Sequence, residues 1–385
     1  MIEPIPYGRQ NITQMDIEAV VNTLKSDFLT QGPKISEFEQ AFAKYVGANF
    51  AVLVGNGTEA LHISALSLGA NNSSVVLTTP ITFVASANCI AYCRGKIDFV
   101  DIDPDTALMD LDELEKKLGS NPLGYYSGVL PVDFAGLPVD LERLRSIADK
   151  YNLWIIEDAC HAPGGYFVDS AGQKQFCGNG QFADVSVFSF HPVKHIACGE
   201  GGMVTTNNEK LYHKLCRLRT HGIIKDPLLL QQNHGGWYYE MQDLGYNYRM
   251  PDILASLGIS QLSRADEGIL RRIEIAKKYD AAFKNTPINI NVGKYREGNA
   301  YHLYIIQIER RKELYDFLRK HHIFTQVHYI PVHLMPYYRQ LGWKEGDFPL
   351  AEKYYEQCLS LPMYPTLTDE EQNFVIEKVL EFYKI

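Results

Sequence analysis

Short apolar stretches alternate with amphipathic stretches through the first half of this sequence, and this alternation restricts the possible folds. Strands are predicted at residues 51–54, 75–79, 97–102, 128–134 and 153–158. Helical spacing of apolar residues predicts helices between them, for example over 58–68 and 81–93. Short strands that alternate with helices form a mainly parallel sheet with helices on both faces. We therefore predict an α/β fold whose ligand lies at the carboxyl ends of the strands.

The remainder of the sequence indicates a second, smaller unit. A chain of 385 residues exceeds what one hydrophobic core usually serves. Helical periodicity over 251–283 can carry the chain out of the first unit, and a further amphipathic helix is predicted over 370–383. We predict a large domain over residues 1–250 and a small α+β domain over residues 251–385.

Charge and cysteine content exclude several classes of partner. The net charge is −9 and no basic block is present, which argues against nucleic acid or an anionic membrane as a partner. The seven cysteines are scattered without a CxxC pair, a pattern that favours free thiols over a disulfide framework or a zinc site. No signal peptide or membrane-spanning stretch is apparent. We expect a cytoplasmic protein with no bound metal.

Lys194 is the first candidate for chemistry. It follows a predicted strand over 183–190 and precedes the glycine cluster of Gly199, Gly201 and Gly202. A lysine in a glycine-rich turn just past an apolar strand is well placed for covalent catalysis. A solvated surface charge is the alternative, since the chain has 37 lysine and arginine residues.

The segment GNGTEAL, residues 55–61, joins a predicted strand to a predicted helix. Glycine lets the backbone approach a ligand closely, and the free N–H groups at a helix start attract phosphate. The spacing of a P-loop or of a GxGxxG dinucleotide motif is absent. Gly57 and Thr58 are therefore candidates for holding a phosphate group, and a capped turn is the alternative explanation.

Asp158 lies at the carboxyl end of the strand predicted over 153–158. A carboxylate is costly to bury there unless it is paired with a cation, and an acid in a surface loop is the alternative. His161 follows three residues later and suits either a structural role or a contact with a ligand ring. A lysine that forms a Schiff base, an acid for a pyridinium nitrogen and a phosphate site are together the groups that pyridoxal phosphate requires.

Six segments resemble the DegT/StrS-type sugar aminotransferases and occur in the order of that family: GNGTEAL, TTPITFVAS, EDACHA, SFHPVK, GEGGM and LGYNYRM. The resemblance covers nearly the whole chain. It implies a fold-type-I transferase that uses pyridoxal 5'-phosphate as its cofactor. In the family pattern, Lys194 forms the Schiff base, Asp158 pairs with the ring nitrogen, and Gly57, Thr58 and Ser189 hold the phosphate.

The same resemblance implies roles for three further residues. Phe83 matches the aromatic residue that stacks on the cofactor ring, and burial in a helix core is the alternative. His161 stands where many relatives have glutamine, near the ring. Asn247 matches a residue that reaches the phosphate of the neighbouring subunit, which implies a homodimer with shared active sites.

A narrower resemblance concerns the substrate. It lies in the opening PYGRQ, in residues 237–250 and in residues 325–333, and it points to the branch that produces UDP-4-amino-4,6-dideoxy-N-acetyl-β-L-altrosamine for pseudaminic acid. That branch transfers an amino group, with L-glutamate as the usual donor in the family, to C4 of a UDP-linked 4-keto-6-deoxy-N-acetylhexosamine. Tyr7 and His328 fall where it contacts the sugar nucleotide. Structural roles for His328 and His333 are the alternative.

Other functions stay open. One is a 3- or 4-aminotransferase for another UDP- or dTDP-linked keto sugar. Dehydrases of the family have histidine in place of the Schiff-base lysine, so the presence of Lys194 favours transamination. A non-catalytic protein that binds a sugar nucleotide would need neither Lys194 nor Asp158.

Overall fold

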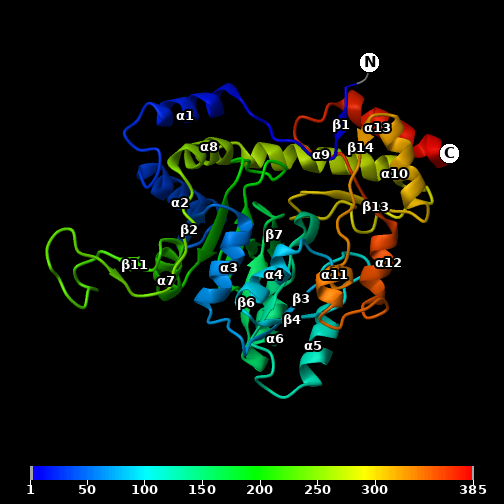
Figure 1. Ribbon diagram of the computed structural model, residues 1–385. Helices are drawn as coiled ribbons and strands as arrows, with labels where there is room; N and C mark the ends of the chain where they lie inside the picture. Colours follow the sequence, from blue (N-terminus) through cyan, green and yellow to red (C-terminus); the bar gives the residue numbers. More distant parts are fainter. Residues whose placement is uncertain (1–2, 384–385) are drawn as a thin grey trace.

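A computed structural model describes residues 3–383 of the chain (Figure 1). Its centre is a seven-stranded sheet with the order β2-β10-β9-β6-β5-β3-β4. The strands are β2 (Phe50–Val54), β3 (Val75–Thr78), β4 (Lys96–Phe99), β5 (Gly128–Leu130), β6 (Trp154–Asp158), β9 (Val185–Ser189) and β10 (Gly202–Thr206). Strand β10 runs antiparallel to both of its neighbours, and the other pairings are parallel. The predicted α/β fold with a mainly parallel sheet is confirmed.

Alternation along the strands divides the apolar residues between two faces of the sheet. In β2, Val52 and Val54 join one buried cluster, whereas Ala51 and Leu53 join another. Helices α3 (Gly57–Ser67), α4 (Ala85–Tyr92) and α7 (Glu209–Arg219) contribute to the first cluster. Helices α2 (Pro33–Val46), α5 (Leu111–Gly119) and α6 (Leu141–Tyr151) contribute to the clusters on the opposite face. Both faces of the sheet are therefore covered, as a mainly parallel sheet requires.

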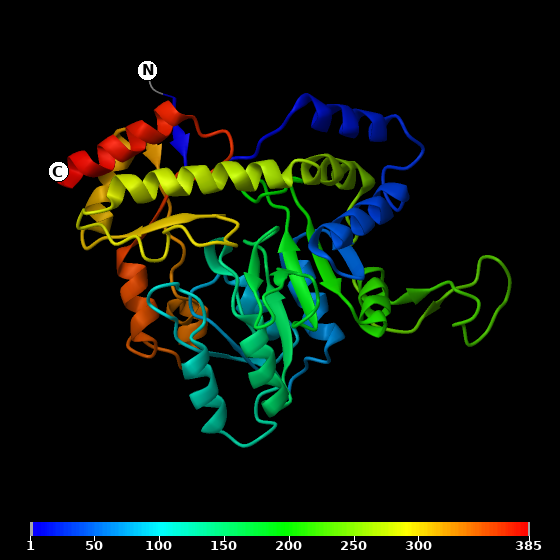
Figure 2. The same cartoon turned by 180° about the vertical axis from the view of Figure 1, so that it is seen from behind.

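Two consecutive helices lead into the C-terminal part, α8 (Asp252–Leu262) and α9 (Ala265–Phe283), and both views show them along one side of the molecule (Figures 1 and 2). Beyond them β13 (Tyr304–Gln307) pairs with β15 (Cys358–Leu361). The other elements there are α10 (Arg311–Lys320), β14 (Ile323–Phe324), η2 (Val332–Leu334), α11 (Pro336–Arg339), α12 (Pro349–Gln357) and α13 (Asp369–Tyr383). A domain boundary at residue 250 stays a prediction. Within residues 3–383, no helix has the length and apolar character needed to cross a membrane.

Several short elements extend from this framework. The N-terminal strand β1 (Ile5–Pro6) pairs in parallel with β14, far along the chain, and is followed by helix α1 (Gln14–Leu24). The single-turn helix η1 (Phe134–Gly136) follows β5, and β7 (Tyr166–Val168) forms a hairpin with β8 (Lys174–Phe176). Strands β11 (Ile223–Ile224) and β12 (Glu240–Met241) form the base of an arm that projects from the body in both views.

Helix α4 begins later than the helix predicted over 81–93. Two side-chain hydrogen bonds hold the preceding loop: Thr79 Oγ1 accepts the N–H of Ile81 at 3.3 Å, and Thr82 Oγ1 lies 2.7 Å from Ser86 Oγ. Such local bonds compete with helical hydrogen bonding. Phe83 therefore lies outside the helix, with 58% of its surface exposed, and the alternative of a core position for Phe83 is wrong.

Two carboxyl groups, of Asp133 and Glu157, are buried together next to the Cys177 thiol. One ligand atom from each of the three side chains lies within 4.8 Å of the others. Asp133 Oδ1 accepts the N–H of Val139 at 2.9 Å, and Glu157 Oε2 accepts the N–H of Gly178 at 3.0 Å. Burial raises the pKa of both carboxyls, and the Glu157 charge raises that of Asp133 further. Both shifts favour the protonated form, so the fold favours a proton shared between the two carboxyls.

This proton makes stability depend on pH. Both pKa values are raised in the folded protein. The contribution of this pair to the free energy of unfolding is therefore fully present below the unfolded pKa of about 4, and it is lost as pH rises through the raised values. Asp133→Asn keeps an acceptor for Val139 and supplies a donor to Glu157. The free energy of urea unfolding should therefore fall less in Asp133→Asn than in the wild type as pH rises above the unfolded carboxyl value of about 4. Equal falls in both proteins would contradict proton sharing.

Candidate active site

A cavity of about 780 Å³ lies where the parallel strands end. Its walls come from distant parts of the chain, including the start of α3, the end of β6 and the connection between β9 and β10. It brings together every residue predicted for the site except Asn247: Tyr7, Gly57, Thr58, Phe83, Asp158, His161, Ser189, Lys194 and His328. The cavity therefore lies at the carboxyl edge of the sheet, where the ligand site is predicted.

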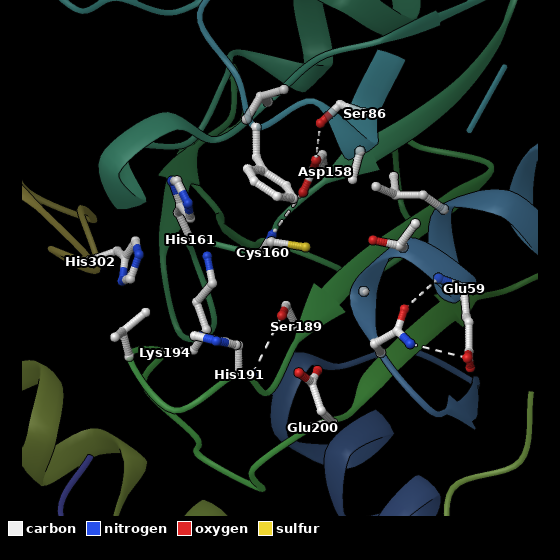
Figure 3. Close-up of a pocket in the computed structure, with 18 of the residues that line it drawn as sticks. Glu59, Ser86, Asp158, Cys160, His161, Ser189, His191, Lys194, Glu200 and His302 are labelled. Carbon is white, nitrogen blue, oxygen red and sulfur yellow. Dashed lines mark hydrogen bonds between the residues drawn. The ribbon is translucent and has the colours of Figure 1, made fainter. Parts of the chain in front are cut away.

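Lys194 lies in the loop that joins β9 to β10. Because β10 is antiparallel to β9, this loop returns at the same edge of the sheet. The Lys194 N–H donates to the carbonyl of His191 at 2.9 Å, and the side chain extends toward His161 and Asp158 (Figure 3). Burial lowers the pKa of the amine, against the opposing effect of Cys160 and Asp158. A lysine with a lowered pKa is a better nucleophile and base near neutral pH.

Asp158 ends strand β6, with 5% of its surface exposed. Its Oδ2 accepts the hydroxyl of Ser86 at 2.7 Å, and its Oδ1 accepts the N–H of Cys160 at 3.2 Å. Since the Ser86 proton points to the carboxylate, the neighbouring Thr82 hydroxyl donates to Ser86. This buried relay fixes the orientation of a carboxylate that lines the cavity.

The start of α3 forms another wall. Asn56 caps the helix, because its side chain accepts the N–H of Glu59 at 2.9 Å. Gly57 is the first helical residue, and a Cβ there would lie 3.1 Å from Cβ of Ser189. Glycine therefore allows the helix start to lie close to Ser189. The backbone of Gly57 and the hydroxyls of Thr58 and Ser189 form a suitable cradle for a phosphate.

His161 is buried beside two other cavity residues, Tyr329 and His302. Its Nδ1 accepts the N–H of Ala135 at 3.3 Å, and its Nε2 lies 3.2 Å from Oη of Tyr329. The rings of His161 and His302 have centroids 4.3 Å apart. Burial holds the pKa of His161 well below its usual value, and the charge of Lys194 lowers it further. The imidazole is therefore neutral at neutral pH.

Tyr7 and His328 both line the cavity, with ring centroids 5.2 Å apart. His328 Nδ1 lies 2.8 Å from the hydroxyl of Ser360, and burial lowers its pKa to about 3. His333 is elsewhere: it is buried outside the cavity lining, and its Nε2 lies 2.9 Å from Oε1 of Glu352. The two histidines of this segment thus have different surroundings, and only His328 faces the cavity.

Asn247 does not line the cavity formed by its own chain. It is exposed, and it forms an isolated antiparallel bridge with Thr220 at the base of the projecting arm. Its neighbour Tyr248 does line the cavity, and the Tyr248 hydroxyl lies 3.0 Å from Nδ1 of His62.

Several cavity residues were not predicted. Ser86 and Tyr329 stand within the motifs TTPITFVAS and TQVHYIPVH, so the motifs gave their positions without their roles. Glu200 similarly stands within GEGGM. His302 has no distinguishing local pattern, and only the fold brings it to the site.

The residues that line the cavity fit pyridoxal phosphate. They supply an amine, an oriented carboxylate, a helix start with two hydroxyls, and the exposed ring of Phe83. The buried Ser86 hydroxyl occupies only one acceptor position of the Asp158 carboxylate. The carboxylate can therefore also accept a hydrogen bond from a ligand.

Known proteins resemble this chain over nearly its full length. A protein of Methanocaldococcus jannaschii, MJ1066, is 41% identical over 97% of this chain and 96% of its own. The spore coat polysaccharide biosynthesis protein SpsC of Bacillus subtilis is 37% identical over 99% and 97%. The UDP-4-amino-4,6-dideoxy-N-acetyl-β-L-altrosamine transaminase of Campylobacter jejuni is 36% identical over 98% and 99%.

Solved structures give the same result. The PLP form of the sugar aminotransferase Spr1654 from Streptococcus pneumoniae superposes with a TM-score of 0.88 at 29% identity, over 99% of this chain and 100% of that one. PseC of Helicobacter pylori, an aminotransferase of pseudaminic acid biosynthesis, has the same TM-score, identity and coverage.

The sequence profile of the DegT/DnrJ/EryC1/StrS aminotransferase family matches residues 10–380. The fold is that of fold-type-I aminotransferases, and the cofactor is pyridoxal 5'-phosphate. The chain therefore belongs to the DegT/DnrJ/EryC1/StrS family and is a sugar aminotransferase that depends on pyridoxal phosphate.

Proposed function

We propose that this enzyme transfers an amino group from L-glutamate to C4 of a UDP-linked 4-keto-6-deoxy-N-acetylhexosamine. The product would be UDP-4-amino-4,6-dideoxy-N-acetyl-β-L-altrosamine, a precursor of pseudaminic acid. The main support for amino transfer is that the Lys194 amine and the Asp158 carboxylate share one cavity with a phosphate cradle. The substrate is proposed from the likeness to the Campylobacter jejuni transaminase and to PseC.

A second candidate is amination of another UDP- or dTDP-linked keto sugar at C3 or C4. The likeness to SpsC, a protein of spore coat polysaccharide biosynthesis, favours it, because this chain is 37% identical to SpsC and 36% identical to the transaminase. Discrimination between such sugars depends on contacts with single hydroxyl groups.

The proposed mechanism assigns a task to each group in the cavity. When bound, the cofactor supplies an aldehyde that carries the amino group and a ring that withdraws electrons from the reacting carbon. Lys194 would hold it through Nζ and, once free, would move the proton at the reacting carbon with the same atom. Asp158, oriented by Ser86, would accept a hydrogen bond from the ring nitrogen. Gly57, Thr58 and Ser189 would bind the phosphate.

Two aromatic residues and two histidines would complete the binding site. Phe83 would stack on the cofactor ring, since its ring is exposed in the cavity wall. Tyr7 and the neutral His328 would contact the sugar nucleotide through aromatic surface and hydrogen bonds. His161 would lie near the cofactor ring.

The proposed catalytic unit is a homodimer in which Asn247 of each subunit reaches the phosphate in the other subunit. The exposure of Asn247 and its place at the base of the projecting arm support this arrangement. Exposed apolar side chains on the arm, Leu228, Trp237, Met241 and Leu244, supply surface for such a contact.

Removal of the amine is the first test. Lys194→Ala should lose the visible absorption of covalently held cofactor and lower turnover at least roughly 1,000-fold, because both depend on Nζ. Absorption spectra and single-turnover assays measure the two effects. Lys210→Ala, an exposed lysine at the start of α7, is the matched control and should retain both. Unchanged amino transfer in Lys194→Ala would refute the mechanism.

The substrate can be identified with a panel of UDP- and dTDP-linked 3- and 4-keto sugars, with L-glutamate as donor and NMR of the product. We expect the highest kcat/KM for the UDP-linked 4-keto-6-deoxy-N-acetylhexosamine, by roughly tenfold or more over sugars that differ at one hydroxyl. Faster amination of a dTDP-linked or 3-keto sugar would support the second candidate instead.

Mixed dimers test whether the site is shared. In a dimer of Lys194→Ala and Asn247→Ala subunits, one site would receive an intact Lys194 from one subunit and an intact Asn247 from the other. Random mixing should restore about one quarter of wild-type activity, at a cofactor concentration where each variant alone is inactive. If Asn247 acts within its own chain, mixing will restore none.

A further inference from the structure

The hydrogen bonds of His161 define which of its nitrogens carries the proton. The backbone N–H of Ala135 can only donate, so His161 Nδ1, 3.3 Å away, must accept. The imidazole is buried and neutral, and a neutral ring with an accepting Nδ1 carries its proton on Nε2. His161 Nε2 therefore donates to the atom it faces, Oη of Tyr329, at 3.2 Å.

This polarity determines the direction of the Tyr329 hydroxyl. Because Oη accepts the proton of His161, the hydroxyl hydrogen of Tyr329 must point away from the imidazole. Tyr329 lines the same cavity as Lys194 and Asp158, and among residues 3–383 its hydroxyl has no hydrogen-bonding partner except His161. A donor is therefore available to a ligand in the cavity. Burial also raises the pKa of Tyr329, so the hydroxyl remains protonated.

Packing holds both rings of this relay. The His302 ring lies against His161, with centroids 4.3 Å apart and planes 39° apart. The rings of His161 and Tyr329 are nearly parallel, with planes 24° apart. Phe134 packs edge-on against Tyr329, with centroids 6.1 Å apart. The direction of the hydroxyl is thus set by the surrounding structure before any ligand binds.

We infer that Tyr329 is a catalytic hydrogen-bond donor to an oxygen atom of the ligand, and that His161 is the positioning residue that directs this donor. The acceptor is an oxygen that bears negative charge, either the phenolic oxygen of the cofactor or the carbonyl oxygen of the keto sugar. A fixed donor stabilises negative charge on such an oxygen. The inference depends on the cavity being the aminotransferase site and not on which sugar is used.

Three variants test the relay. Tyr329→Phe removes the donor. His161→Leu removes both hydrogen bonds of the imidazole, whereas His161→Gln can accept from Ala135 through Oε1 and donate to Tyr329 through Nε2. Tyr337→Phe, an exposed tyrosine outside the cavity lining, is the matched control. Each holoenzyme is examined by a pH titration of its visible absorption without sugar, and by single-turnover amination of the keto sugar.

If the acceptor is the cofactor oxygen, Tyr329→Phe and His161→Leu should shift the midpoint of the spectral titration by about one pH unit. If the acceptor is the sugar oxygen, the spectra should stay unchanged and the rate of amination should fall roughly tenfold or more, while the half-reaction with L-glutamate is retained. In either case the titration midpoint and the amination rate of His161→Gln should lie closer to the wild type than those of His161→Leu.

The inference is overturned if Tyr329→Phe leaves the titration midpoint within about 0.3 pH unit and the amination rate within about twofold of the wild type. It is also overturned if His161→Gln is as impaired as His161→Leu, because a purely packing role would not distinguish a donor amide from an isobutyl group. Should Tyr329→Phe fail to fold, the comparison of the two His161 variants decides the question alone. Failure of the proposed sugar assignment would appear only in the substrate panel and would leave the spectral titration unaffected.

Discussion

A carboxylate buried in a protein must be paired with a cation and with hydrogen-bond donors, and Asp158 is such a carboxylate in this active site. It ends the central strand β6, where water is largely excluded. The Ser86 hydroxyl and the N–H of Cys160 satisfy part of its hydrogen-bonding capacity, and the Lys194 amine lies across the same cavity. A protonated ring nitrogen of the cofactor would complete the compensation. Helix α4 supplies Ser86 to this carboxylate, and the β9–β10 loop supplies Lys194 to the same cavity.

Much of the fold could be predicted because its signal is local. Each strand and helix up to β6 could be predicted from the spacing of apolar residues within its own segment. The alternation of these elements then predicts the mainly parallel sheet, which is confirmed. The start of α4 was predicted too early, since apolar periodicity does not register the local hydroxyl bonds of Thr79 and Thr82 that hold the loop before it. Pairing of β1 with β14 joins opposite ends of the chain, and no periodicity within a two-residue strand could indicate it.

Some residues of the candidate site could likewise be predicted from local sequence patterns, whereas others are brought to it only by the fold. Lys194 and Asp158 could be identified because each follows an apolar strand, and the shared edge of a parallel sheet brings such positions together. Ser86 and Tyr329 act through hydrogen bonds to residues far away in the chain, so their sequence motifs could not reveal their partners. His302 reaches the cavity from the C-terminal part, and only the packing of its ring against His161 distinguishes it from any other buried histidine.

The single antiparallel strand has a consequence for how the site assembles during folding. Ser189 and Gly202 pair across a short connection, whereas Val54, which pairs with the same glycine, lies far earlier in the chain. Closing a short loop costs less conformational entropy than closing a long one. The β9–β10 hairpin can therefore form early, with Lys194 and Ser189 already in their relative places. The other walls of the cavity depend instead on contacts between segments that are distant in the sequence.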